Sequence, residues 1–397
     1  MANVTKGEPE GKAAKSTDAY ERVRQLWDKV EDIMGKQIKP RVLVAGKTGV
    51  GKSSVLNALL GRLVFETGVI PTTKANSEEL WESQAGSLVV VDVPGLGEAD
   101  AAKMSDGYTY EENLARLAQL NAHLLLMILK CDDRALSVET DYLRRWSAHP
   151  ILSTLPTLLV INQIDKMKPV REWNPASLNL ATPRAEKERN IREYVDYVSG
   201  LEVFSPIHAT GRVFPVAAGE SHDDQNQFGV EALRQAIYDA LPDAAKTMFA
   251  RAVNLKDQEA NRLTKYYSVA AAAVVAANFF PASDALIIAP IQIAMIVHLG
   301  KLWEMDITAS AASGIFTSLG ASFAGRFTVQ TIVSFFPLIK NLVGPPLAYG
   351  LTFLMGKAVN ELFRMGTTEA SEEQLRKLAE KFEAEAKQQA EAWKRER

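Results

Sequence analysis

The sequence of 397 residues contains a single cysteine, Cys131, and it lacks an apolar run near its N-terminus. One thiol cannot form an internal disulfide, which suits a reducing compartment, and we expect Cys131 to be packed at a strand end rather than to act as a nucleophile. The polar stretch MANVTKGEPEGKAAK has none of the apolar core of a secretory signal. We therefore expect a cytoplasmic protein, with the cytoplasmic face of a membrane as the alternative location.

The sequence also lacks an excess of basic residues and has no internal repeat. Its formal net charge is -3, whereas broad electrostatic binding to nucleic acid requires a basic surplus on one face. No RNA-binding motif offsets that deficit, so there is no direct nucleic-acid signal. The length is too great for one ordinary domain and favours at least two.

Changes in composition divide the chain into segments. Residues 1–17 are polar, apolar residues then recur at helical spacing, and after residue 265 long stretches carry no charge. We expect a disordered tail over 1–17, an amphipathic helix over 18–37, an α/β domain over 38–245, a linker helix over 246–265, an apolar helical domain over 266–364 and a charged helix over 365–397.

Short apolar runs alternate with helical stretches in the α/β region. The runs are RVLVAG (41–46), SLVVVD (87–92), HLLLMILK (123–130), TLLVIN (157–162) and RVFPVAA (212–218). Such runs, separated by helices, predict a mainly parallel, doubly wound sheet. In this architecture the ligand binds at the carboxyl ends of the strands.

The stretch GKTGVGKSS follows the first run and matches the phosphate-loop pattern G-x-x-x-x-G-K-[ST]. Its glycines let backbone N–H groups face a phosphate, Lys52 would reach the β- and γ-phosphates, and Ser53 would coordinate Mg²⁺. The alternative is a glycine-rich turn without a ligand. The candidate phosphate-binding residues are Gly46, Lys47, Thr48, Gly49, Val50, Gly51, Lys52, Ser53 and Ser54.

Two further segments carry candidate residues for Mg²⁺ and the γ-phosphate. Asp92 ends an apolar run in DVPG and could hold Mg²⁺ through water, with the Gly95 N–H at the γ-phosphate. A switch also needs a threonine on a loop that closes over Mg²⁺, and PTTK offers Thr72 and Thr73, of which we prefer Thr73. A plain turn is the alternative for PTTK.

The stretch LVINQIDK carries the candidate base site. A carboxylate that accepts two N–H groups distinguishes guanine from adenine, and we assign this role to Asp165. Asn162, at the end of its strand, would brace the phosphate loop and the base. An ATP site built on the same phosphate loop remains the alternative.

These ordered motifs resemble the G domain of Era-like GTPases, in the branch typified by YeeP and YkfA. The resemblance rests on GKTGVGKS, PTTK, DVPG, NQID and PVAA within residues 40–241, and residues 266–363 resemble the helical family of unknown function numbered 697. It implies a P-loop NTPase fold of the Ras-like type, GTP or GDP with Mg²⁺ as ligands, and base contacts from Asn162, Asp165 and the backbone of Ala217 or Ala218. Gln163 stands where the family usually has a lysine that covers the base.

The catalytic residues implied are Lys52, Thr73 and Gly95, but the usual water-orienting glutamine is replaced by Leu96. Glu98 and Asp100 could orient water, although solvated loop acids are the plainer interpretation. We expect a GTPase with slow intrinsic turnover that a partner or dimerisation through the G domains stimulates. The alternative is an assembly or structural GTP-binding protein with negligible turnover, acting by oligomerisation or membrane remodelling.

The apolar C-terminal half predicts a helical hairpin over 266–281 and 285–303, followed by another apolar run over 307–325. The last run is about as long as a membrane span, for which about 20 residues are needed, but serine, threonine and glycine weaken it. A membrane-associated domain, slightly favoured, and a buried soluble bundle both stay open. In either case residues 266–364 would bind membrane or a protein partner.

Overall fold

The chain divides into two compact units, one spanning Ile38–Leu255 and the other containing Lys256–Arg397. The predicted tail over 1–17 and helix over 18–37 lie outside the residues that the computed structural model describes. The described residues are 38–64, 78–82, 87–93, 110–219, 225–277, 284–305, 307–308, 310–316, 342–369 and 372–396.

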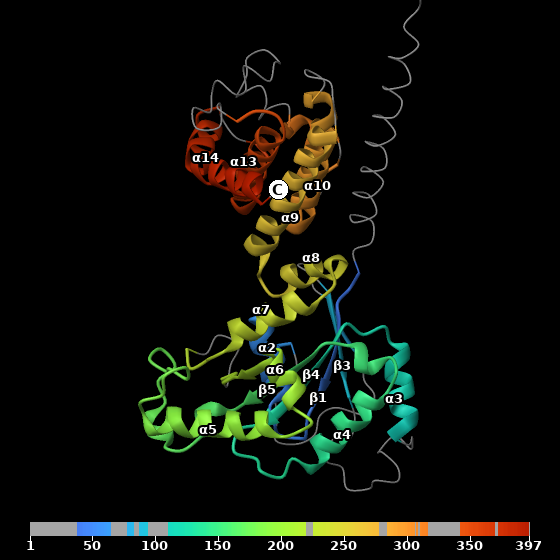
Figure 1. Ribbon diagram of the computed structural model, residues 1–397, viewed down its shortest axis with the longest axis vertical. Helices are drawn as coiled ribbons and strands as arrows, with labels where there is room; N and C mark the ends of the chain where they lie inside the picture. Colours follow the sequence, from blue (N-terminus) through green and yellow to red (C-terminus); the bar gives the residue numbers. More distant parts are fainter. Residues whose placement is uncertain are drawn as a thin grey trace, which may run out of the picture. The chain divides into compact units, whose positions relative to one another are not determined.

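The first unit is built around a six-stranded sheet with the order β2-β3-β1-β4-β5-β6 (Figure 1). All pairings are parallel except that of β2 with β3, which confirms the predicted mainly parallel sheet. Only β2 was not expected, because its sequence EELWE is mostly charged. The strands are β1 (Arg41–Ala45), β2 (Glu78–Glu82), β3 (Ser87–Asp92), β4 (Leu124–Lys130), β5 (Thr157–Asn162) and β6 (Val213–Pro215).

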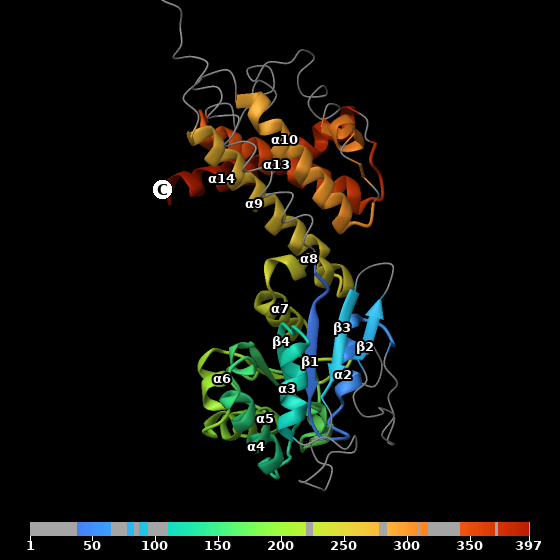
Figure 2. The same cartoon turned by 90° about the vertical axis from the view of Figure 1, so that its right-hand side faces the viewer.

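One face of the sheet packs against α3 (Tyr110–Gln119), α4 (Ser137–Ala148) and α5 (Glu186–Gly200). Successive strand side chains point to opposite faces, so Leu43, Met127 and other odd-numbered residues of the strands enter this core with helical residues such as Trp146. Figure 2 shows β1, β3 and β2 side by side, with these helices to their left. The continuous apolar runs predicted as strands are therefore buried on both faces.

The opposite face is completed by α2 (Lys52–Leu60) and α7 (Val230–Ala240), which pack against each other. The Arg234 guanidinium of α7 donates hydrogen bonds to the carbonyl oxygens of Ala58 and Leu59, each at 3.1 Å. Because these carbonyls lie at the C-terminus of α2, a cation there also complements the helix dipole. The remaining elements are η1 (Leu152–Thr154), η2 (Ile164–Lys166), η3 (Val170–Glu172), α6 (Ser205–Ala209) and α8 (Asp243–Ala252).

The second unit is helical, as predicted. Helix α9 (Lys256–Ala277) packs on α10 (Asp284–Leu302) and α13 (Pro345–Arg364), and α14 (Glu372–Arg395) packs on α13. The hairpin predicted over 266–281 and 285–303 is present, but its first helix begins ten residues earlier, at Lys256. The change of composition near Tyr266 marks a change of surroundings along one helix rather than a helix start.

Small and polar residues shape the interior of this helical unit. A Cβ added to Gly356 of α13 would lie 2.6 Å from the Thr264 Cγ2 atom of α9, so glycine permits the two helices to approach closely. Two buried polar side chains pair with each other, because the Gln292 side-chain amide donates to the Thr352 hydroxyl at 3.0 Å. Burial of such groups requires these partners.

Within the part of the chain that the structure describes, none of the helices combines the length and the apolar content that crossing a bilayer requires. Residues 317–341, which contain the end of the apolar run at 307–325, are outside that part. Membrane association of the helical unit stays a prediction.

Candidate nucleotide-binding site

The predicted motifs meet at the carboxyl ends of the parallel strands. Val44 of β1 lies beside Asp92 of β3, and Lys130 of β4 lies beside Asn162 of β5. The phosphate loop follows β1 directly, so it faces both Asp92 and the loop after β5. Thr73, Gly95 and Leu96 are outside the described residues.

Two glycines of the phosphate loop have backbone conformations that side chains disfavour. Gly49 has φ 82° and Gly51 has φ 90°, both in the left-handed region. A Cβ on Gly51 would also lie 2.5 Å from the Asn162 Nδ2 atom. Helix α2 begins immediately afterwards at Lys52, so its unpaired N-terminal N–H groups and the loop amides form an anion-binding end.

Lys52 is held within the loop. Its Nζ atom donates to the Gly46 carbonyl oxygen at 2.9 Å and lies 3.8 Å from Asp92 Oδ1. Ser53 and Ser54 occupy the first turn of α2. A serine hydroxyl and a carboxylate at the phosphate end form a hard-oxygen donor set that suits Mg²⁺, which normally takes its other ligands from phosphates and water. These residues therefore fit the predicted ion.

The side chain of Lys47 is directed to the loop after β4 and to α4. Its Nζ atom lies 3.0 Å from Glu139 Oε2 and 3.3 Å from Asp133 Oδ2, and it also donates to the Ala135 carbonyl oxygen. Burial acts to lower the pKa of Lys47, but the two carboxylates outweigh it and raise that pKa above its ordinary value. No sequence pattern indicates this contact, because the partners lie far away along the chain.

Asn162 joins the phosphate loop to the base side of the site. Its Nδ2 atom donates to the Val50 carbonyl oxygen at 2.9 Å, and its Oδ1 atom accepts the Ala218 N–H at 3.3 Å. The side chain is buried. This is the bracing contact expected for Asn162.

Gln163 and Asp165 follow in a tight turn. Gln163 has φ 64°, and its side-chain amide donates to the Gly49 carbonyl oxygen at 2.9 Å, so it too contacts the phosphate loop. Asp165 lies in η2 and is half-buried. Ala217 and Ala218 are buried beside this turn, because the Ile164 N–H donates to the Val216 carbonyl oxygen at 3.3 Å.

Sequence reasoning missed Lys187, on the first turn of α5. Its Nζ atom donates to the carbonyl oxygens of Asp165, at 2.7 Å, and Met167. A fully buried lysine that contacts the turn predicted to read the base is a functional candidate, but no motif pattern includes a position so far downstream.

Cys131 lies beside Asn162 and is not accessible to solvent. Its N–H donates to the Asn162 carbonyl oxygen at 2.8 Å, and its side chain is buried. Burial, with a smaller contribution from Asp132, raises the pKa of the thiol to about 12. A thiol in this state is a packing group, as the sequence predicted.

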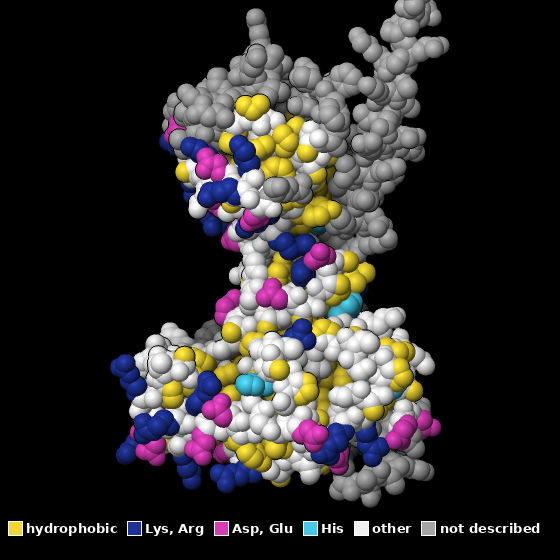
Figure 3. Space-filling view, in the orientation of Figure 1, with side chains coloured by type: hydrophobic (Ala, Val, Ile, Leu, Met, Phe, Trp, Pro, Cys, Tyr) yellow, Lys and Arg dark blue, Asp and Glu magenta, His cyan; other side chains and the backbone are white. Residues whose placement is uncertain are grey.

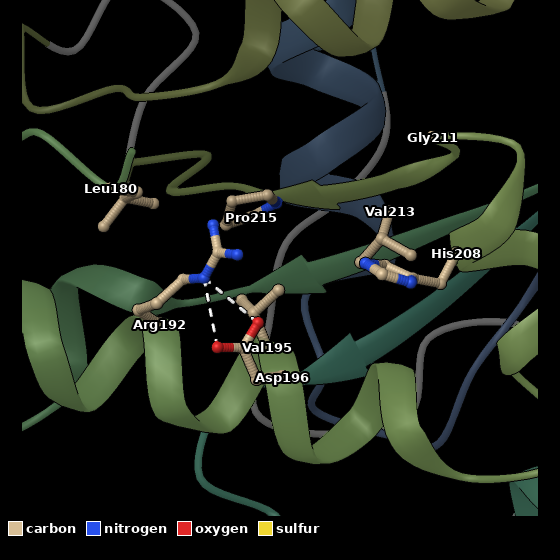
Figure 4. Close-up of a pocket in the computed structure, with 8 residues that line it drawn as sticks. All are labelled: Leu180, Arg192, Val195, Asp196, His208, Gly211, Val213 and Pro215. Atoms are coloured by element: carbon tan, nitrogen blue, oxygen red, sulfur yellow. Dashed lines mark hydrogen bonds and ion pairs between the residues drawn. The ribbon is translucent and has the colours of Figure 1, made fainter. Parts of the chain in front are cut away.

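A separate cleft runs along β6, between that strand and helices α5 and α6 (Figure 4). Arg192 and Asp196 lie on its α5 side and form an ion pair with each other at 3.0 Å. Its lining includes His208 and Val213 but none of the predicted nucleotide-binding residues. It is therefore distinct from the candidate nucleotide site.

A parallel sheet with a glycine-rich loop leading into a helix N-terminus, and a lysine within that loop, defines a P-loop nucleotide-binding protein. Comparison with known families agrees. Residues 41–163 match the 50S ribosome-binding GTPase family, and residues 243–360 match a Domain of unknown function (DUF697). Residues 41–163 thus resemble the G domain of Era-like GTP-binding proteins, and an additional helical domain matching DUF697 follows.

The chain is similar to uncharacterised proteins and to probable GTP-binding proteins. The chain is 28% identical over 210 residues to the uncharacterised protein YfjP of Escherichia coli. The aligned region covers 53% of this chain and 64% of that protein. It is 29% identical over 178 residues to a probable GTP-binding protein EngB of Streptococcus mutans, covering 43% of this chain and 80% of that protein. The chain thus spans less than two thirds of the length of YfjP.

Among solved structures, Era of Aquifex aeolicus bound to GDP·AlF4⁻ matches at 19% identity with a TM-score of 0.35, over 52% of this chain and 58% of that chain. Toc33 of Arabidopsis thaliana in complex with GDP and Mg²⁺ matches at 18% identity with a TM-score of 0.31, over 60% of this chain and 93% of that chain.

Proposed function

We propose that this protein binds GTP with Mg²⁺ and hydrolyses it to GDP as a molecular switch, with the helical unit as its output domain. The observation that carries the proposal is the link between the two halves of the site. Asn162 binds the carbonyl oxygen of Val50 in the phosphate loop, and Asp165 follows it in the next turn. The spacing of phosphate and base groups is thereby fixed by one buried amide.

Each residue then has a defined task. Lys52 neutralises charge on the β- and γ-phosphates, and the N-terminus of α2 with the loop amides binds their oxygens. Ser53 and Asp92 would hold Mg²⁺, Asp92 through water, with Thr73 closing over it. When bound, Mg²⁺ neutralises charge on the phosphate oxygens. Asp165 accepts two N–H groups of guanine, which adenine cannot supply in that arrangement.

Slow intrinsic turnover is part of the proposal, because Leu96 cannot orient water where glutamine does so in Ras-like proteins. A partner protein or a second G domain would supply the missing group. The same residue supports a second candidate function, in which the protein binds GTP with negligible turnover and acts by assembling.

The helical unit is the proposed contact for a membrane or a protein partner. The proposal does not include an extended basic surface for binding nucleic acid. On the face of the α/β unit that Figure 3 shows, the coloured basic and acidic groups are interspersed rather than gathered in a patch of one sign.

Titration of the purified chain with GTP, GDP and ATP tests the central claim. We expect guanine nucleotides to bind more than about 100-fold tighter than ATP, because a polar base pocket rejects a base that leaves its groups unpaired. Asp165→Asn should lose that preference, and Lys52→Ala should lose triphosphate binding. Preference of the wild-type protein for ATP would overturn the proposal.

Phosphate release separates the two candidate functions. Turnover that rises with protein concentration and disappears in Lys52→Ala supports a GTPase stimulated by self-association. Tight GTP binding without phosphate release at any concentration, but with GTP-dependent oligomers, supports the assembly protein instead.

A further inference from the structure

We infer that Lys187 is a positioning residue for guanine recognition: its buried side chain holds the turn that presents Asp165 to the base. This inference rests on the proposed function, since it concerns how that base site achieves its selectivity. It adds a residue that lies outside the ordered motifs.

The contacts of Lys187 bracket Asp165 along the backbone. Its Nζ atom donates to the carbonyl oxygen of Asp165 itself, at 2.7 Å, and to that of Met167 two residues later. The side chain is fully buried, with 0% exposure. A buried donor that binds two carbonyls of one turn fixes both its path and its distance from α5.

The surroundings of Lys187 favour this arrangement over a mobile one. The Trp173 ring lies over the Nζ atom, 5.4 Å from it to the ring centre, and a cation over an indole face is attracted to it. Burial lowers the pKa of Lys187, while the carboxylates of Asp165 and Glu172 act in the opposite direction. Glu172 also accepts the backbone N–H of Lys187 at 3.1 Å.

The helix turn that carries Lys187 is itself fixed. The neighbouring Glu188 carboxylate accepts backbone N–H groups from Asn179 at 2.9 Å, Arg184 at 2.6 Å and Ala185 at 2.9 Å. The loop before this first turn of α5 leads back along the chain to Asp165 in η2. Lys187 therefore acts from a rigid base, which a positioning contact needs.

The position of Asp165, which Lys187 holds, determines how well the site selects guanine over other bases. Asp165 must place both carboxylate oxygens against the two N–H groups of guanine, and a small displacement of the turn would spoil one of these contacts first. Hypoxanthine, the base of inosine nucleotides, lacks the exocyclic amino group of guanine. The ratio of GDP affinity to IDP affinity therefore reports how well Asp165 is placed, independently of the phosphate contacts.

Lys187→Met tests the inference, because methionine keeps the approximate length of the side chain without its donor. Arg192→Met is the matched control, since it removes a cation from the exposed side of the same helix. Dissociation constants are measured for GDP, IDP and ADP. We expect Lys187→Met to weaken GDP binding by about 10- to 100-fold, the loss typical of a hydrogen bond from a charged donor, and to move the GDP-to-IDP ratio towards one. ADP binding and the Arg192→Met control should match the wild type.

The outcomes separate the two proposals. A wild-type protein without preference for GDP over ADP contradicts the proposed function. A wild-type preference that Lys187→Met retains, with an unchanged GDP-to-IDP ratio, overturns the role of Lys187 alone, even if overall affinity falls. Should circular dichroism show that Lys187→Met does not fold, Lys187→Gln takes its place, because its amide keeps N–H donors but places their nitrogen one bond short of the Nζ position. An intermediate ratio then supports the inference, and a wild-type ratio overturns it.

Discussion

The side-chain amide of Asn162 donates to the carbonyl oxygen of Val50 at 2.9 Å, across 112 residues of sequence. Its oxygen accepts the N–H of Ala218 at 3.3 Å. One buried side chain thus connects the phosphate loop, the end of β5 and the loop after β6. Stability of the α/β unit and formation of the nucleotide site depend on the same contact.

Replacement of Asn162 by alanine should therefore affect both properties. The Val50 carbonyl and the Ala218 N–H would lose their partner in a buried place, which costs about 2 to 4 kcal/mol of the free energy of unfolding. Urea denaturation of Asn162→Ala measures this, and Asn190→Ala of α5 is the control, because it removes an exposed amide hydrogen bond, to the Lys168 carbonyl oxygen at 3.0 Å. Nucleotide affinity should fall at least about tenfold. An Asn162→Ala protein as stable as the control would show that the contact is dispensable.

Gly51→Ala and Gly61→Ala form a pair that isolates the effect of close packing. Both glycines have left-handed backbones, with φ 90° and 64°, so each alanine costs about 1 to 2 kcal/mol. A Cβ at Gly61 meets no atom within 4 Å, whereas at Gly51 it would lie 2.5 Å from Asn162 Nδ2. We expect Gly51→Ala to lose about 1 to 3 kcal/mol more and to bind GDP poorly, with Gly61→Ala binding normally. Equal stabilities would contradict this.

Glu139→Gln tests the contact between Lys47 of the phosphate loop and α4. Glu139 is only 1% exposed and lies 3.0 Å from the Lys47 Nζ atom, so losing its charge should cost about 1 to 3 kcal/mol. The control is Glu111→Gln, which removes an exposed pair with Arg145 and should cost less than about 0.5 kcal/mol. Thermal denaturation compares them. A cost as small as that of the control would mean that solvent replaces the carboxylate without loss.

The parts of the fold that were predictable have strong local patterns. Strands β4 and β5 are uninterrupted apolar runs, and a sheet buried on both faces requires such runs. Strand β2 was missed because its charged residues EELWE fit an edge position rather than a core. The last strand ends at Pro215, earlier than the apolar run over 212–218 predicts, although the Val216 N–H still donates to the Ile161 carbonyl oxygen at 2.8 Å.

The candidate site likewise contains some residues that local sequence patterns identify and others whose roles depend on contacts distant in the sequence. The phosphate loop and the Asn162–Asp165 turn have fixed spacings, so their residues could be named from the sequence. Lys47 and Lys187 owe their positions to partners on other elements, Glu139 on α4 and the Asp165 carbonyl. The residue type alone does not show whether a lysine is exposed or buried, because that depends on the packing around it.

Cys131 should resist thiol reagents in the folded protein. Burial raises its pKa to about 12, so the thiolate fraction at pH 8 is about 10⁻⁴, and the buried sulfur is also shielded from reagents. Timed reaction with a disulfide reagent at pH 8 measures this. We expect reaction only after unfolding in urea, with one thiol per chain. Rapid modification under native conditions would refute the packed environment.

The stability of the helical unit should fall as the pH is lowered through the range in which free histidine titrates. His298 is 2% exposed and its Nδ1 atom lies 3.3 Å from the Tyr267 hydroxyl. Burial depresses the pKa of His298 from 6.5 to about 4; the Glu259 carboxylate acts to raise this pKa, and Arg262 and Lys301 act with burial to lower it, each to a smaller extent. Unfolding therefore takes up a proton between these values.

For a depressed pKa, the contribution to stability is complete above the unfolded value and is lost as the pH falls towards the folded value. The unfolding transition of the helical unit, measured in urea, should have a free energy about 2 kcal/mol lower at pH 5 than at pH 7.5 because of this group. Other carboxylates add a common pH dependence, so the comparison is with variants. His298→Gln should remove the His298 part of the slope, whereas His208→Gln, an exposed control in α6, should retain it. Identical slopes in all three proteins would show that His298 is accessible to protons in the folded state.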